Sequence, residues 1–185
     1  MDSQLSMRLA QPDEAARVME ILEDGKRSIA RFGIEQWQHG YPNLEAVEKD
    51  IAAGACYVAE DASGALVGSL ALLGGIDAEY CRAQVGWLTA NPFEGEGTAP
   101  YLAIHRCATA SEALERGVMG FMFAESEAIA RSRGLESIRI DTHPGNIAMR
   151  RFLAKQGFTE LSPFELTQKG DEETDLTRIA YEKLV

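Results

Sequence analysis

The chain has 185 residues, 45% of them hydrophobic and 25% charged, a composition typical of globular proteins that argues against a disordered or fibrous chain. The formal net charge of −11 argues against a nucleic acid partner, because binding a phosphate backbone requires a surplus of Lys and Arg. No secretory leader and no apolar run long enough to cross a bilayer are recognisable, so we expect a cytoplasmic protein with no membrane partner.

The first fifty residues predict one short strand and two helices. Residues 7–10 form the candidate strand, and apolar residues at helical spacing indicate a helix over 13–32. Asn43 is placed to cap a second, shorter helix. The segment 36–42 between the helices is polar and aromatic and is expected to form a loop.

A hairpin pattern follows, with strands at 56–59 and 65–72 joined by a turn at 61–64. The next stretch is less regular. Residues 85–88 are interpreted as a strand, and the Gly, Pro and Glu residues of 91–100 predict a loop.

The second half alternates strands and helices. The pattern predicts, in order, a strand at 101–109, a helix at 117–133, a strand at 137–141, a helix capped by Asn146, and strands at 158–161 and 176–183, the last after an acidic turn at 170–173. Hairpins combined with crossover helices predict an α/β fold in which one mixed sheet carries helices on both faces, all within a single domain, residues 1–185.

Four motifs in the second half occur in an order found in one enzyme family. They are the strand 104–109, the glycine-containing helix start 116–120, the strand and turn 137–146, and the Gly-Phe end of a helix at 155–158. This arrangement resembles the GNAT N-acetyltransferases. The resemblance implies the single-domain GNAT fold, with a mostly antiparallel central sheet, and acetyl-CoA as cosubstrate. The segments 36–38, 104–106 and 141–143 also look like a bacterial subgroup whose members mostly lack an assigned substrate.

The resemblance also implies where the cofactor binds. Exposed strand-edge amides can hold the pantetheine arm and polarise the thioester carbonyl, and in the family this edge corresponds to Cys107, Ala108 and Thr109. The N–H groups at a helix N-terminus can bind the diphosphate, and a glycine lets the main chain approach it closely. The expected cradle consists of Leu114, Glu115, Arg116, Gly117, Val118, Met119 and Gly120, with Asn146 serving as a cofactor contact, a helix cap or both.

The sequence departs from the family pattern at three positions. The cradle usually begins with Arg or Gln and ends with Gly or Ala, where this chain has Leu114 and Met119. Many members also carry a Tyr on the last helix that protonates the leaving thiolate, where this chain has Leu153.

The candidate catalytic residue is His105, because an imidazole exchanges protons near neutral pH and can act as a general base. The alternative is a histidine held by hydrogen bonds in the core. Gln36, Trp37 and Tyr41 are candidates for the wall of the acceptor site, or for a hydrophobic lid over the core. Cys107 is interpreted as a small apolar side chain rather than an acyl-enzyme nucleophile.

These observations predict an acyl-CoA N-acyltransferase that moves acetyl directly from acetyl-CoA to a primary amine of a small molecule or peptide. The alternative is a non-catalytic GNAT-fold module that binds acyl-CoA or a partner. The three cysteines are scattered, so no disulfide framework and no metal are expected. A homodimer would be a common arrangement for such an enzyme.

Overall fold

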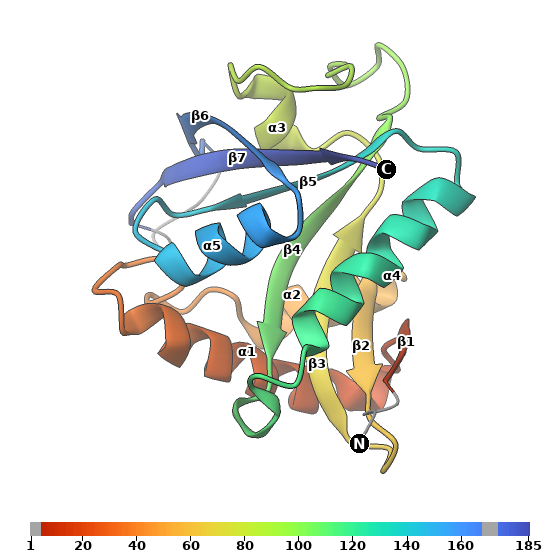
Figure 1. Ribbon diagram of the computed structural model, residues 1–185, viewed down its shortest axis with the longest axis vertical. Coiled ribbons are helices and arrows are strands. Elements are labelled where there is room, and N and C mark those ends of the chain that lie inside the picture. Colours follow the sequence, from red (N-terminus) through yellow and green to blue (C-terminus); the bar gives the residue numbers. More distant parts are fainter. Residues whose placement is uncertain (1–4, 168–173) are drawn as a thin grey trace.

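The computed structural model describes residues 5–167 and 174–185, and in these residues seven strands form a single sheet (Figure 1). The strand order is β1-β2-β3-β4-β5-β7-β6, in which β4 and β5 run parallel and the other neighbours run antiparallel. The strands are β1 (Ser6–Leu9), β2 (Cys56–Glu60), β3 (Leu66–Leu73), β4 (Tyr101–Thr109), β5 (Ser137–Thr142), β6 (Thr159–Glu165) and β7 (Thr177–Leu184). The mixed, mostly antiparallel sheet predicted from the sequence is confirmed; the expected acidic turn at 170–173 lies outside the described residues.

The helices cover both faces of the sheet, as predicted (Figure 1). They are α1 (Ala15–Ala30), α2 (Leu44–Ala52), α3 (Ala78–Arg82), α4 (Val118–Ser132) and α5 (Ile147–Lys155). Helices α1 and α2 lie on one face, and α4 and α5 lie on the other. In the described parts of the chain, none of the helices is both long and apolar enough to cross a membrane.

Helix ends follow the predicted capping residues. The Asn43 side chain accepts a hydrogen bond from the Ala46 N–H at 2.9 Å, and Asn146 accepts one from the Met149 N–H at 3.2 Å. Gly157 follows α5 with φ +82°, a backbone conformation that favours glycine. The helix boundaries are therefore largely determined by local sequence.

The prediction of a strand at 85–88 is wrong, and α3 was not predicted. Residues 85–88 form no strand ladder; side chains fix them instead. The Trp87 indole N–H donates to the Tyr80 carbonyl oxygen, and the Trp87 ring lies over the guanidinium of Arg139, 4.1 Å from its carbon. Packing against buried groups therefore replaces strand pairing in this segment.

A fully buried ion pair anchors the same region. The Arg139 Nε donates to the Glu182 carboxylate at 3.0 Å, and both side chains are completely buried. The Glu182 carboxylate also accepts hydrogen bonds from the hydroxyls of Thr89 and Ser137, so its charge is satisfied on several sides. This cluster ties the irregular segment after α3 to β5 and β7.

Strands β4 and β5 diverge partway along their length. They pair only from Tyr101↔Ser137 to Ala103↔Arg139. Beyond this point β4 contains a bulge, where Arg106 has φ +46° and the register with β3 is interrupted. The fork leaves the β5-facing side of residues 104–109 without a partner strand in the described structure, and it creates space for a site inside the sheet.

Candidate active site

A cavity of about 550 Å³ occupies the fork between β4 and β5. Its floor is the stretch 104–109 of β4, and its walls come from α1, the α1–α2 loop, α3, β5, α4 and α5. A volume of this size can hold much of a drug-sized molecule. The fork therefore brings together residues that are far apart in the sequence.

The predicted cofactor edge lies in this cavity. Cys107, Ala108 and Thr109 all line it, and none of the described strands pairs with them on the side from which β5 has diverged. The predicted contact Asn146 also lines the cavity while capping α5, so the structure accommodates both of its expected roles.

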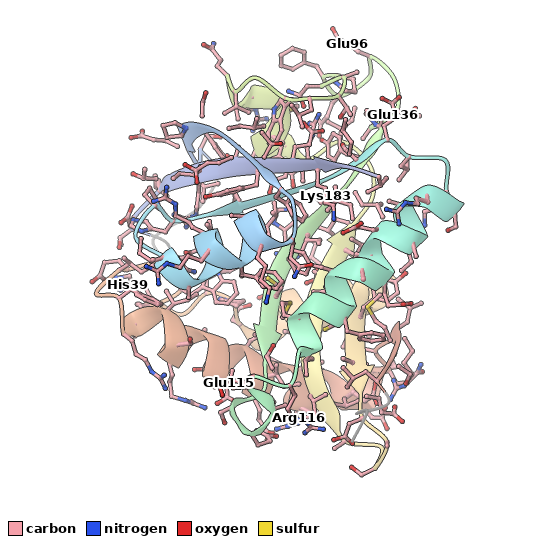
Figure 2. All side chains as sticks on the ribbon, viewed as in Figure 1. His39, Glu96, Glu115, Arg116, Glu136 and Lys183 are labelled. Carbon is pink, nitrogen blue, oxygen red and sulfur yellow. The ribbon has the colours of Figure 1, made fainter. Side chains whose placement is uncertain are left out.

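The predicted cradle is divided between the cavity and its surroundings. Leu114 and Met119 line the cavity, whereas the other predicted cradle residues, Glu115, Arg116, Gly117, Val118 and Gly120, do not. Figure 2 shows Glu115 and Arg116 in the loop at the N-terminal end of α4. Gly117 caps α4 with φ +77°, and a Cβ built on it would meet open space. No side chain at Gly117 therefore stands between the solvent and the first N–H groups of α4.

His105 forms a pair with a carboxylate that the sequence did not single out. The His105 Nε2 lies 2.9 Å from the Asp77 Oδ2, and both side chains are mostly buried at the cavity. The His105 ring stacks on the ring of Tyr80 with centroids 5.6 Å apart. His105 is thus hydrogen-bonded, as the alternative expected, and it also lines the cavity, as a catalytic base must.

The charge state of Asp77 follows from its contacts. Burial favours the neutral acid, but the hydrogen bond from His105, the positive charge of its ring whenever it is protonated, and the N–H groups of Tyr80 and Glu79 together outweigh it. The pKa of Asp77 therefore lies below its ordinary value, and its carboxylate is ionised at neutral pH.

The α1–α2 loop is braced against the β4 bulge. The Arg106 guanidinium donates to both carboxylate oxygens of Asp50 at 2.6 and 2.8 Å, and its third nitrogen donates to the Tyr41 hydroxyl at 2.6 Å. The Gln36 side chain accepts a hydrogen bond from the His143 N–H at 3.3 Å. Gln36, Trp37 and Tyr41 all line the cavity, so the expected acceptor wall and His105 face the same space.

Helix α5 presents no hydroxyl group to the cavity. Leu153 is fully buried in the hydrophobic core, and Phe152 is the aromatic residue that α5 places at the cavity. The hydroxyl of Tyr80, another residue that lines the cavity, is buried and has no hydrogen-bond partner among the described residues. Burial, reinforced by the charges of Asp141 and Asp77, raises the pKa of Tyr80 well above its ordinary value.

If the chain transfers acetyl from acetyl-CoA, as its resemblance to the GNAT family implies, we expect Cys107→Ala to retain turnover close to that of the unmodified protein. Burial raises the pKa of the Cys107 thiol to about 12, so the thiolate that a nucleophilic mechanism needs is almost absent at neutral pH. Steady-state release of CoA thiol at saturating acetyl-CoA measures the effect. A covalent acetyl adduct on Cys107 in the mass spectrum, together with loss of turnover in the variant, would contradict this expectation.

Asp77 and Tyr80 are the main site residues that the sequence analysis missed. The available signal was an Asp at the start of a short run able to form a helix, because Asp is a favoured N-cap residue. The Asp77 side chain does cap α3, accepting from two N–H groups of its first turn. In the described residues, no group of three or more His, Cys, Asp or Glu side chains is arranged to hold a metal.

Comparisons with known proteins identify this architecture. A family model described as the acetyltransferase (GNAT) family matches residues 15–158. An acetyltransferase of this family from Streptococcus agalactiae has a crystal structure that is 28% identical, covering 98% of this chain and 95% of its own, with a TM-score of 0.78. A Listeria monocytogenes member is 17% identical with a TM-score of 0.70, covering 98% of this chain and 95% of its own.

The PaiA N-acetyltransferase of Thermoplasma acidophilum, whose structure contains coenzyme A, shares the fold at 16% identity and a TM-score of 0.66, covering 98% of this chain and 99% of its own. Among curated proteins, no sequence matches this chain. The fold and the fork define an acyltransferase that uses an acyl-CoA donor. The chain belongs to the GNAT acetyltransferase family.

Proposed function

We propose that this protein is an N-acetyltransferase that binds acetyl-CoA in the β4–β5 fork and transfers the acetyl group directly to a primary amine. The observation that carries the proposal is the β5-facing edge of residues 104–109 in β4, which has no partner strand in the described structure and opens onto a cavity of about 550 Å³ beside the start of α4. Strand-edge amides and a helix N-terminus suit the amide-rich arm and the diphosphate of CoA.

In this proposal the chain supplies the binding groups. Main-chain amides near Ala108 hold the pantetheine arm and stabilise the negative charge that develops on the thioester oxygen. The open approach at Gly117 admits the diphosphate to the first turn of α4. Asn146, Met149 and Phe152 form the α5 wall against which the cofactor lies.

His105 serves as the general base. An ammonium has no lone pair, so the acceptor must lose a proton before it attacks the thioester carbonyl. His105 lines the same cavity as Gln36, Trp37 and Tyr41, which we propose as the acceptor wall. With no hydroxyl from α5 at the cavity, the leaving thiolate takes its proton from solvent or from the amine nitrogen.

The test is release of CoA thiol from acetyl-CoA with a panel of amines, monitored with a thiol reagent. The panel should include a polyamine and a peptide with a free N-terminus, because proteins of this fold include a spermidine N-acetyltransferase chimera and a ribosomal-protein-alanine N-acetyltransferase. Thiol release with any amine, accompanied by an acetylated product in the mass spectrum, is the expected result.

The alternative is a non-catalytic module that binds acyl-CoA, and it is favoured by the absence of a hydroxyl group at Phe152 and Leu153. Titration calorimetry with acetyl-CoA separates the two functions. Binding without turnover across the panel would support an acyl-CoA-binding module. Absence of acetyl-CoA binding would overturn both functions.

A further inference from the structure

The carboxylate of Asp77 joins the wall of the cavity to the imidazole of His105. Its Oδ1 accepts the N–H groups of Glu79 and Tyr80 at 2.9 and 3.0 Å and so caps α3. Its Oδ2 lies 2.9 Å from the His105 Nε2. Each oxygen therefore has a separate role, one in the helix and one at the histidine.

The contact determines which ring nitrogen carries the proton. An ionised carboxylate can only accept hydrogen bonds, so the Nε2 of His105 must donate and must carry the hydrogen. The other nitrogen, Nδ1, has no hydrogen-bond partner among the described residues and keeps its lone pair. Because His105 lines the cavity, Nδ1 is the nitrogen left to accept a proton there.

The packing around the pair restricts the ring further. The His105 ring stacks on Tyr80 at an interplanar angle of 24°, and Tyr80 belongs to the helix that Asp77 caps. Tyr80 is itself fixed between Trp87 and Phe164, with ring centroids 5.1 and 6.2 Å away. The hydrogen bond to Asp77 and the stacking on Tyr80 together restrict rotation of the His105 imidazole.

We propose that Asp77 is a positioning residue that keeps His105 in its Nε2–H tautomer, so that Nδ1 takes the proton from the acceptor amine. This inference rests on the proposed function. The acceptor ammonium gives one proton to Nδ1, and its freed lone pair forms the C–N bond. The C–S bond breaks with its electron pair on the thiolate, which takes the second proton lost by nitrogen. The imidazolium, stabilised by the Asp77 carboxylate, returns its proton to solvent.

Asp77→Asn is a sharp test because it separates the two roles of the side chain. Asparagine caps a helix about as well as aspartate, so the Oδ1 contacts with α3 are retained. The amide NH₂ that replaces Oδ2 can only donate, so His105 must accept at Nε2 and carry its proton on Nδ1. The variant should therefore fold normally with the wrong tautomer.

Nitrogen-15 NMR of histidine-labelled protein reports the tautomer without requiring turnover. The chain has three histidines, and the spectrum of His105→Gln assigns the His105 signals. We expect the Nε2–H pattern at His105 in the unmodified protein and the Nδ1–H pattern in Asp77→Asn. In Asp77→Asn we also expect kcat/KM to fall by at least about tenfold, mostly through kcat. The loss should not exceed the roughly 10²–10⁴-fold that general base catalysis contributes.

A matched control is Glu35→Gln, which also replaces a carboxylate beside a histidine Nε2, that of His39, but at an exposed position outside the cavity. It should leave both turnover and the His105 tautomer unchanged. An unaltered His105 tautomer in Asp77→Asn, or unaltered kcat/KM in that variant, would overturn the inference. Absence of turnover in the unmodified protein with every amine would instead overturn the proposed function, so the two failures are distinguishable.

Discussion

Replacing His105 with Gln is expected to lower kcat/KM by roughly 10²–10⁴-fold, the usual contribution of a general base. Glutamine is similar in size and can still accept a hydrogen bond, but it cannot take up a proton at neutral pH. The loss should fall on kcat, because the role proposed for His105 belongs to the transfer step and because His105 lies on the floor of the cavity rather than in the helix-start cradle. Steady-state kinetics with an amine identified in the panel measures the effect.

His39→Gln provides the control, because His39 lies in the exposed part of the α1–α2 loop (Figure 2) and, within residues 5–167 and 174–185, its side chain pairs with Glu35 alone. It should leave kcat/KM within about twofold of the unmodified protein, as expected for a surface substitution. Calorimetry should give similar affinities for acetyl-CoA in both histidine variants. If His105→Gln retained full turnover, the general base would have to be another group at the fork.

The sheet and helix framework was predictable because local sequence features determine it. Glycines at helix ends and asparagine caps set the limits of α2, α4 and α5 through backbone groups within a few residues. Short apolar runs bounded by turn residues indicate most of the strands in the same way. Such signals involve residues close together in the chain, so they can be recognised in a single sequence.

The pairing of His105 with Asp77 was not predictable because it depends on contacts between distant segments. His105 and Asp77 are 28 residues apart, and they meet only because α3 folds back over β4. The brace from Arg106 to Asp50 spans 56 residues and depends on a bulge that residue alternation alone does not reveal. The segment 83–100 is likewise ordered by a buried ion pair and not by local pattern, which explains the wrong strand at 85–88.

Replacing Glu182 with Ala is expected to lower the free energy of unfolding by about 3–5 kcal/mol, because it leaves the buried Arg139 charge without its partner. Domains of this kind are stable by about 5–15 kcal/mol in total, so the variant should be close to unfolding. Urea denaturation followed by circular dichroism measures the change. Glu125→Ala, on the exposed side of α4, should shift the free energy by no more than about 0.5 kcal/mol.

Acid should weaken the same interaction. Burial favours the protonated acid, but hydrogen bonds from Ser137 and Thr89 and the charge of Arg139 outweigh it, so the pKa of Glu182 lies below its ordinary value. Because the pKa is lower in the folded protein, the unfolded chain binds more protons than the folded one as the pH falls. The stability that the Glu182 carboxylate contributes is therefore fully present above its unfolded pKa of about 4.3. It is lost as the pH falls through the lower folded value. Between roughly pH 6 and pH 3, the free energy of unfolding should therefore fall less in Glu182→Ala than in the unmodified protein.

The position of the ion pair connects this stability to the site. Arg139 pairs with Ala103 at the last rung before β4 and β5 diverge, so the buried charges lie at the apex of the fork. An apolar pair of similar volume, Arg139→Met with Glu182→Leu, should recover most of the stability lost in Glu182→Ala, because no charge is then left unpaired. If the ion pair contributes only to stability, the double variant should bind acetyl-CoA as tightly as the unmodified protein does. If it also sets the angle of the fork, the double variant should fold stably but bind acetyl-CoA more weakly in calorimetry.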